Sequence, residues 1–252
     1  SSKNIILIGD QMQLSQPIQG VHAGNSGKSA LDFLLEGEDT IPVSRGIFLS
    51  ETRRLNKEIC DYISSSFYDF RLKPHSVTSE RSVALELKDI KDKGIFYVPT
   101  QHTDCTQRSD EEGKLINEYF KKILGKTSTD NGKNKKIDHD DIMVVAPFNM
   151  QVNNLKKIIN KKESRIGTID KFQGQEAKVV FISMTSSDPE NLPRHKEFFF
   201  SRNRLNVAIS RAQCVAVILF NPNLLLTSCQ KINEMKLINN FCKLLKYKIE
   251  VN

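Results

Sequence analysis

Short apolar runs alternate with amphipathic stretches along most of the chain. The apolar runs are rich in Val and Ile, which favour strands, and they predict strands at residues 4–8, 46–49, 94–98, 142–146, 165–169, 179–184 and 215–220. Apolar residues at helical spacing predict helices at residues 30–35, 56–68, 150–161, 205–211 and 232–245. Apolar strands separated by amphipathic helices are typical of parallel sheets buried on both faces. The pattern therefore predicts an α/β fold, with a mainly parallel sheet and helices on both faces.

Two polar stretches complete the pattern. Ser109 is followed three residues later by Glu112, which is the spacing of a capping box and predicts a helix opened by Ser109. Residues 125–140 are polar and charged, and they predict an exposed loop without chemistry.

The first apolar run stands at the start of the chain, with no earlier element to pair with. A lone strand cannot form a sheet, and residues 11–45 are rich in Gln, Gly and Ser. A second, cleaner start follows at residue 46. We therefore expect residues 1–45 to belong to a neighbouring domain and residues 46–252 to form the main domain.

The composition is that of a globular protein, with 38% hydrophobic and 27% charged residues among 252. No apolar run approaches the ~20 residues that cross a bilayer, and no signal-peptide pattern opens the chain. We therefore expect a cytoplasmic protein without a membrane partner. The five cysteines form no CxxC pair and the five histidines no HxH or HExxH pattern, so no metal site is predicted. The net charge of +7 favours a polyanionic partner.

Four polar motifs fall just after predicted strands. They are GDQMQL (residues 9–14), ETRRLN (51–56), TIDKFQGQE (168–176) and SRNRLNVAISRA (201–212). In parallel α/β sheets ligands bind beyond the carboxyl ends of the strands, so we expect the motifs at that edge. Arg204 and Arg211 are seven residues apart, on one face of a predicted helix. Arginine suits phosphate because its planar fork makes paired, charged hydrogen bonds, although each motif alone could be an ordinary turn.

Together and in this order, the motifs resemble those of superfamily 1 helicases, in the branch that includes the nonsense-mediated-decay helicases and the nuclease-linked replication helicases. GDQMQL resembles motif III, TRRLN the Gln-Tyr-Arg-Met motif, APFNMQ (residues 146–151) motif IV, TIDKFQGQE motif V and RLNVAISRA motif VI. The chain looks closest to bacterial proteins in which a RecB-like nuclease precedes the helicase. The resemblance implies a RecA-like P-loop NTPase fold, with residues 1–45 as the tail of the first RecA-like domain and residues 46–252 as the second.

The resemblance also implies a nucleotide cleft. A sensor of the γ-phosphate and two arginine fingers would form its catalytic set: Gln13, Arg54 and Arg211. The other nucleotide-binding positions would be Arg53, Gln173, Gly174, Glu176 and Arg204, with Glu176 on the ribose. Arg53 stands where the family usually has a tyrosine stacked on adenine, and a guanidinium can also stack on a base.

A second set of residues would face the nucleic acid. The resemblance places Pro147, Phe148 and Thr168 against a single strand, with Ala146 in place of a common threonine. Single-stranded DNA is the implied partner, and RNA stays an open alternative because no motif that reads bases or the 2′-hydroxyl is visible. The three phenylalanines at 198–200 fit a core better than a base-stacking platform.

The sequence lacks the parts that hold phosphate and metal in these motors. GNSGKS (residues 24–29) ends like a Walker A loop, but His22 stands where the pattern requires glycine and no strand leads into it. No other Walker A and no acidic Walker B motif is present. We therefore expect ATP and Mg²⁺ to bind mainly to the N-terminal RecA-like domain of a longer protein, and we do not expect this chain to hydrolyse ATP alone.

Two hypotheses follow. One is the C-terminal half of an ATP-dependent helicase, moving 5′ to 3′ along DNA by resemblance. The other is a non-enzymatic nucleic-acid-binding or partner-docking module whose motor has decayed. The combined presence of Arg54, Glu176 and Arg211 favours the first.

Overall fold

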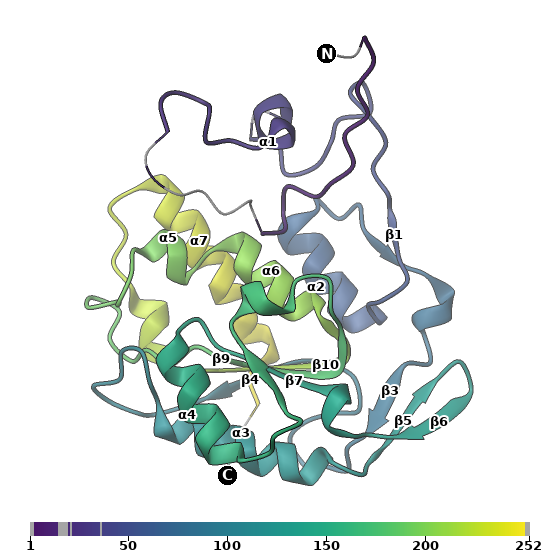
Figure 1. Cartoon of the computed structure of the whole chain (residues 1–252), viewed down its shortest axis with the longest axis vertical. Coiled ribbons are helices and arrows are strands. Elements are labelled where there is room, and N and C mark those ends of the chain that lie inside the picture. The colour runs from purple at the N-terminus through teal and green to yellow at the C-terminus, as the bar shows by residue number, and fades with distance from the viewer. Residues whose placement is uncertain (1–2, 15–19, 21, 36, 250–252) are drawn as a thin grey trace.

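A five-stranded parallel sheet forms the centre of the protein (Figure 1). The computed structural model describes residues 3–14, 20, 22–35 and 37–249, so the predicted tail of residues 1–45 lies partly outside the described residues. The strand order is β4-β10-β9-β7-β8, and every pair is parallel. The strands are β4 (Gly94–Pro99), β7 (Ile142–Val145), β8 (Arg165–Gly167), β9 (Ala177–Ser183) and β10 (Ala212–Phe220). The predicted fold class and all five of these strands are confirmed.

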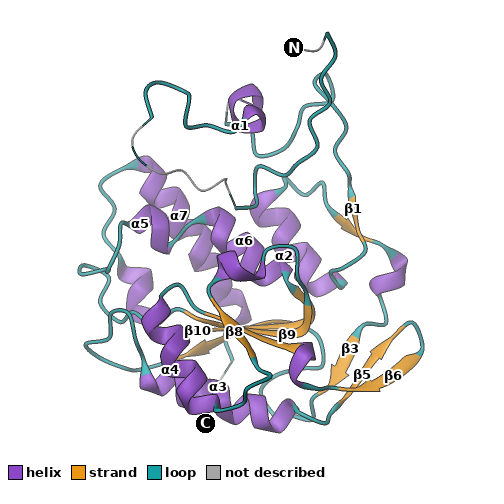
Figure 2. Ribbon diagram, viewed as in Figure 1, coloured by secondary structure: helices purple, strands orange, loops and turns teal. Residues whose placement is uncertain are grey.

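Helices cover both faces of this sheet (Figure 2). One face carries α2 (Lys57–Phe67), α6 (Arg202–Ser210) and α7 (Ile232–Cys242), and the other carries α3 (Asp110–Ile123) and α4 (Asn149–Ile159). Short helices are formed by α1 (Ala30–Leu35) and α5 (Lys196–Phe199). Alternate residues of each strand enter opposite cores: Met143 and Val145 pack with α2 and α6, whereas Val144 packs with α3 and α4. This explains why the strands are apolar throughout.

The prediction of a loop at residues 125–140 is wrong, because these residues contain a β-hairpin. Strands β5 (Thr127–Asp130) and β6 (Lys133–Lys136) pair antiparallel, and β3 (Ser82–Ala84) adds to β5. Asn131 and Gly132 form the turn, with φ of 49° and 71°. An Asn-Gly pair favours the positive φ angles of a tight hairpin turn, which outweighs the polar composition of the flanking residues.

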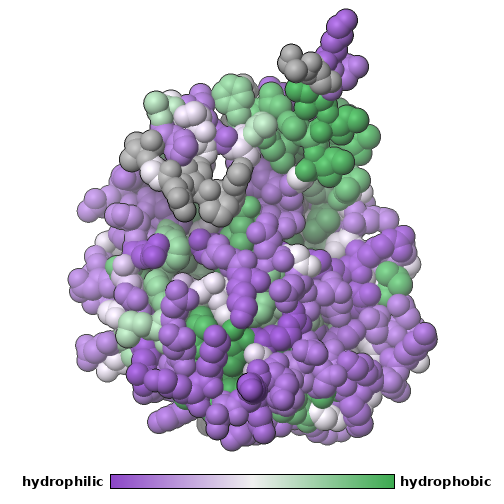
Figure 3. Space-filling model, in the orientation of Figure 1, coloured by the Kyte–Doolittle hydropathy of each residue, from purple (hydrophilic) through white to green (hydrophobic). Residues whose placement is uncertain are grey.

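Two predicted strands near the N-terminus are absent from the described residues. Residues 4–8 and 46–49 form no strand, and β1 (Glu51–Thr52) instead pairs with β2 (Lys73–Pro74). Ile6 and Ile8 are 87% and 92% exposed, because no neighbouring strand covers this run. Figure 3 shows the resulting apolar surface near the N-terminus. In the described part of the chain, no helix is long and apolar enough to cross a membrane.

Candidate functional site

Motif III lies against the helix of motif VI, although about 190 residues separate them. Asn203 of α6 donates its side-chain amide to the carbonyls of Gln11 (2.8 Å) and Gln13 (2.5 Å). Asn206, one turn later, donates to the carbonyl of Met12 at 2.8 Å. Three backbone carbonyls of the loop are therefore held by two asparagines of one helix face. The side-chain amide of Gln13 donates to the Oδ2 atom of Asp10 at 2.9 Å.

A tyrosine joins the loop and the helix from the other side. The hydroxyl of Tyr68, the residue that ends α2, donates to Asp10 Oδ2 at 2.6 Å and accepts from Asn206 at 2.9 Å. Tyr68 is buried, with an exposed fraction of 8%. The sequence motifs gave no sign of this role, because a helix-ending tyrosine most often serves the core.

The two candidate arginine fingers and Glu176 form one cluster. Arg54 Nε pairs with Glu176 Oε2 at 2.7 Å, and Gln213 donates to Glu176 Oε1 at 2.6 Å. Both charged side chains of the pair are partly open to solvent, at 33% and 45%. Gln213 is a further member that the sequence analysis missed, one residue into β10.

Arg211 is the most unusual residue of the cluster because its charge is buried. It is 2% exposed, and its Nη1 donates to the carbonyl of Gln175 at 3.1 Å. Its Nε is buried without a hydrogen-bond partner among the described residues. Burial, and then the nearby positive charge of Arg54, lower the pKa of the Arg211 guanidinium. A buried donor without a partner costs free energy, so an anion reaching Nε would be favourable.

This cluster lies at the opposite edge of the sheet from the one expected. Glu176 directly precedes β9, and Arg211 directly precedes β10, so both stand at the amino ends of parallel strands. Arg54 follows β1, which is not part of the main sheet. The expectation that all four motifs meet at the carboxyl edge is therefore wrong. Motif VI is a helix that leads into a strand, and its last residues reach the edge where that strand begins.

The remaining predicted nucleotide residues are distributed between the two edges. Arg53, Gln173 and Gly174 are exposed, and Gly174 has a φ of +80°, which favours glycine. Arg204 pairs with Asp170 at 2.9 Å and lies over the ring of Phe198, so the structure does not bring it to Arg211.

The three residues predicted to face a single-stranded nucleic acid follow the carboxyl ends of β7 and β8. Phe148 is buried and stacks near Phe198 and Phe199, with centroid distances of 6.3 and 6.2 Å. Pro147 and Arg204 line a cavity of about 50 Å³ beside these rings. Thr168 is half-buried and precedes a short 3₁₀ turn at Ile169–Phe172.

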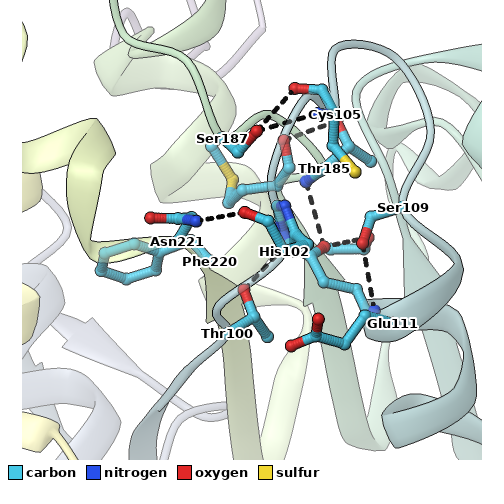
Figure 4. Close-up of polar contacts among 12 residues, drawn as sticks. Thr100, His102, Cys105, Ser109, Glu111, Thr185, Ser187, Phe220 and Asn221 are labelled. Atoms are coloured by element: carbon cyan, nitrogen blue, oxygen red, sulfur yellow. Dashed lines mark hydrogen bonds and ion pairs between the residues drawn. The ribbon is translucent and has the colours of Figure 1, made fainter.

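A network of buried polar groups ties the loops at this carboxyl edge together (Figure 4). Ser109 Oγ accepts from the backbone N–H of Glu112 at 3.2 Å, so the first half of the predicted capping box is confirmed. The second half is wrong. The Glu112 carboxylate instead accepts from Ser183 Oγ (2.5 Å) and the N–H of Thr185 (3.0 Å), and lies 2.9 Å from His102 Nε2. Burial under β9 gives this carboxylate better partners than its own helix offers.

An ion triad holds the turn that carries both arginines of motif TRRLN. Arg81 Nη1 donates to the carbonyls of Arg53 (2.7 Å) and Arg54 (2.8 Å), while its Nε pairs with Asp130 at 2.9 Å. Asp130 also accepts from Lys178 at 3.0 Å. The hairpin that replaced the predicted loop therefore supports the arginine cluster.

The arrangement of the amino-edge cluster fits a polyphosphate, whose oxygens could accept from Arg54 and from the free Nε of Arg211. No group of three or more His, Cys, Asp or Glu side chains able to hold a metal ion occurs in the part of the chain that the structure describes. The cluster thus offers donors for phosphate oxygens.

One parallel sheet covered by helices on both faces thus carries a polar cluster at each of its two edges. A family model described as "AAA domain" matches residues 29–223, which is most of the chain, and the chain belongs to this family. The curated relatives that it matches are named as helicases, some as DNA helicases and others as RNA helicases.

Three relatives illustrate the similarity. The DNA polymerase alpha-associated DNA helicase A of Saccharomyces cerevisiae is 28% identical over 71% of this chain and 28% of its own length. Its Schizosaccharomyces pombe namesake is 26% identical over 82% of this chain and 32% of its own length. The putative helicase mov-10-B.2 of Danio rerio is 27% identical over 88% of this chain and 25% of its own length. The chain thus spans about a third or less of the curated relatives that it matches.

Proposed function

We propose that this chain is the half of an ATP-dependent helicase or translocase that supplies arginine fingers and one side of a single-strand groove. The observation that carries this proposal is the buried Arg211, whose Nε has no partner in the described part of the chain and whose neighbour is a second arginine. Leaving such a donor unpaired is unfavourable in a domain that works alone, and it is resolved when a phosphate enters.

The cluster suggests how nucleotide would act on this half. ATP and Mg²⁺ would be held mainly by an N-terminal RecA-like domain, with residues 1–45 as the tail of that domain. Arg54 would exchange its bond to Glu176 for a phosphate oxygen, which frees the Glu176 carboxylate for a ribose hydroxyl. Gln13, held by its backbone to α6, would approach the γ-phosphate. Because these contacts would exist only when the two domains close, ATP would favour the closed state. Hydrolysis would remove the contacts and let the domains open.

The single-stranded nucleic acid would lie across the carboxyl edge of the sheet, at Pro147, Phe148 and Thr168. We propose single-stranded DNA as the substrate and 5′-to-3′ movement by resemblance. Relatives named as DNA helicases and as RNA helicases both occur, so RNA is the alternative. A preceding RecB-like nuclease domain is part of the same proposal.

The test is Arg211→Ala in the full-length parent protein. An arginine finger stabilises charge in the transition state, so strand-stimulated ATP hydrolysis should fall by about 10³- to 10⁵-fold while single-strand affinity stays nearly unchanged. Arg211→Lys keeps the charge but loses the planar fork, and we expect it to restore little. Wild-type turnover in both variants would refute the proposal and favour a binding module without a motor.

A further inference from the structure

We infer that Arg194, held over the ring of Phe198, is a contact for the phosphate backbone of a single-stranded nucleic acid. This inference rests on the proposed function and adds a contact that the motifs do not contain. Arg194 lies in the connection between β9 and α6, outside motifs V and VI.

Phe198 brings two positive charges together. The guanidinium carbon of Arg194 lies 4.6 Å from the centroid of this ring, and that of Arg204 lies 4.4 Å from it. The negative face of an aromatic ring attracts cations, which fixes the position of long side chains that would otherwise sample many rotamers. The ring is half-buried and packs near Phe148, so it is a fixed support rather than a mobile side chain.

The charges around the ring are not balanced. Arg204 pairs with Asp170 at 2.9 Å, whereas Arg194 is exposed and has no ion pair among the residues that the structure describes. Three acids line the same depression as Arg194: Glu190 accepts hydrogen bonds from Ser228, Glu234 pairs with Lys196 at 3.9 Å, and Glu197 makes no ion pair with Arg194 among the described residues. In the described part of the chain, the Arg194 guanidinium therefore lies over the ring and faces solvent without a hydrogen-bond partner.

The connection that carries Arg194 is anchored where it leaves the sheet (Figure 4). Thr185 is fully buried at a φ of 66°, an unusual conformation for a β-branched residue. Its N–H donates to Glu112, and the hydroxyls of Thr185 and Ser186 donate to the carbonyl of Thr106. Strained backbone of this kind persists only where its surroundings hold it, and it is common at functional sites.

The position and chemistry together select the ligand. Pro147, Phe198 and Arg204 line the same cavity at the carboxyl edge, so the free guanidinium lies beside the surface proposed for the strand. A planar cation next to apolar rings suits a chain of phosphates with flat bases attached. Single-stranded nucleic acid has this combination, and an acidic peptide lacks the flat bases.

The test is fluorescence anisotropy of this chain with a labelled oligothymidylate of about 15 nucleotides, titrated between about 50 and 200 mM salt. Arg194→Ala should weaken binding about 5- to 10-fold and lower the slope of log K against log salt by about 0.7, the loss of one phosphate contact on a single strand. Phe198→Leu keeps the charge, so we expect a weaker loss, about 2- to 3-fold, with an unchanged slope. The double variant should bind about as weakly as Arg194→Ala, because Arg204, the other cation over the ring, is also held by its pair with Asp170.

Lys121→Ala is the matched control, because Lys121 is an exposed cation in the last turn of α3, away from this edge. Affinity and slope should match the wild type. If Arg194→Ala also matches the wild type while the wild type binds the strand, the Arg194 contact is wrong and the proposed function stands. If the wild-type chain binds no strand, the proposed groove itself fails. Displacement of the strand by inorganic phosphate, beyond the effect of ionic strength, would show a small-anion site and overturn the inference.

Discussion

Single arginines in this protein differ in what they contribute to folding. Arg202 and Arg211 bracket the same helix, α6. Arg202 makes a two-bonded pair with Asp39, at 2.9 and 2.6 Å, and so its charge is compensated. Arg211 is buried, and among the described residues its guanidinium makes one hydrogen bond and its Nε has no partner. A buried charge without full compensation opposes folding, which is the expected signature of a residue kept for function.

Arg211→Met should therefore stabilise this chain. The methionine keeps similar volume and removes the desolvated charge, so we expect the free energy of unfolding to rise by about 1 kcal/mol and Tm by about 2–4 °C. Arg202→Met is the control on the same helix and should lower Tm, since Asp39 loses its partner. Thermal unfolding followed by circular dichroism measures both. A lower Tm for Arg211→Met would mean that the guanidinium is satisfied in the free chain.

At the scale of elements, the hairpin of β5 and β6 supports the turn that carries Arg53 and Arg54, which its polar composition does not indicate. Its Asp130 binds both Arg81 and Lys178, and Arg81 in turn holds the carbonyls at Arg53 and Arg54. Burial acts to raise the pKa of Asp130, but the hydrogen bonds from Arg81 and Lys178 outweigh it and lower that pKa. The ionised form is therefore stabilised by folding, so this carboxylate should make stability depend on pH.

Asp130→Asn should lower the free energy of unfolding by about 1–3 kcal/mol at neutral pH. The contribution of a carboxylate with a lowered pKa is complete above its unfolded value, near 3.9, and is lost as pH falls through the folded value. The difference in the free energy of unfolding between wild type and variant should thus become smaller below about pH 4. Urea unfolding across this range measures it. Asp61→Asn, which removes an exposed pair with Lys57, should leave the free energy of unfolding nearly unchanged. A pH-independent difference at Asp130 would contradict the ionic role.

The same elements show what the sequence could and could not predict. The five central strands, α4 and α6 followed from periodicity, because each buries apolar residues on a continuous face. Helix α3 was predicted from its capping residues, and the short helix α5 was not predicted. The hairpin at Asn131 and Gly132 has a local turn signal, but the polar, charged residues on either side of the turn are typical of an exposed loop and hide it. The edge on which Glu176 and Arg211 meet could not be read from local patterns. It depends on which strand each motif leads into, and on parallel pairing between distant segments.

At the scale of the whole molecule, the two proposed sites occupy opposite edges of one sheet. Arg54 and Arg211 stand where β9 and β10 begin, and Phe148 and Arg194 stand beyond the strands' other ends. A rigid parallel sheet between the two sites would transmit domain closure at the amino edge to the single-stranded nucleic acid bound at the carboxyl edge. Under the proposed function, rotation of this sheet as one body would couple the two sites.

The apolar run at residues 4–8 does not join the central sheet. Its backbone makes no strand, and Ile5, Ile6 and Ile8 are 75%, 87% and 92% exposed. Amides of such a segment exchange through small local openings, whereas those of β10, all of whose residues are buried, exchange only through global unfolding. Hydrogen exchange of the monomeric chain should therefore label residues 5–8 within the shortest measurable time and β10 at the rate set by global stability.

In a longer parent that contains the proposed N-terminal RecA-like domain, the same run should become protected, because a fully apolar strand is typical of the interior of a parallel sheet. Ile6→Asp should leave Tm of this chain unchanged within about 1 °C, since surface changes away from contacts are nearly neutral, and should destabilise the longer parent. Protection of residues 5–8 equal to that of β10 in the isolated chain would show that the run belongs to this domain.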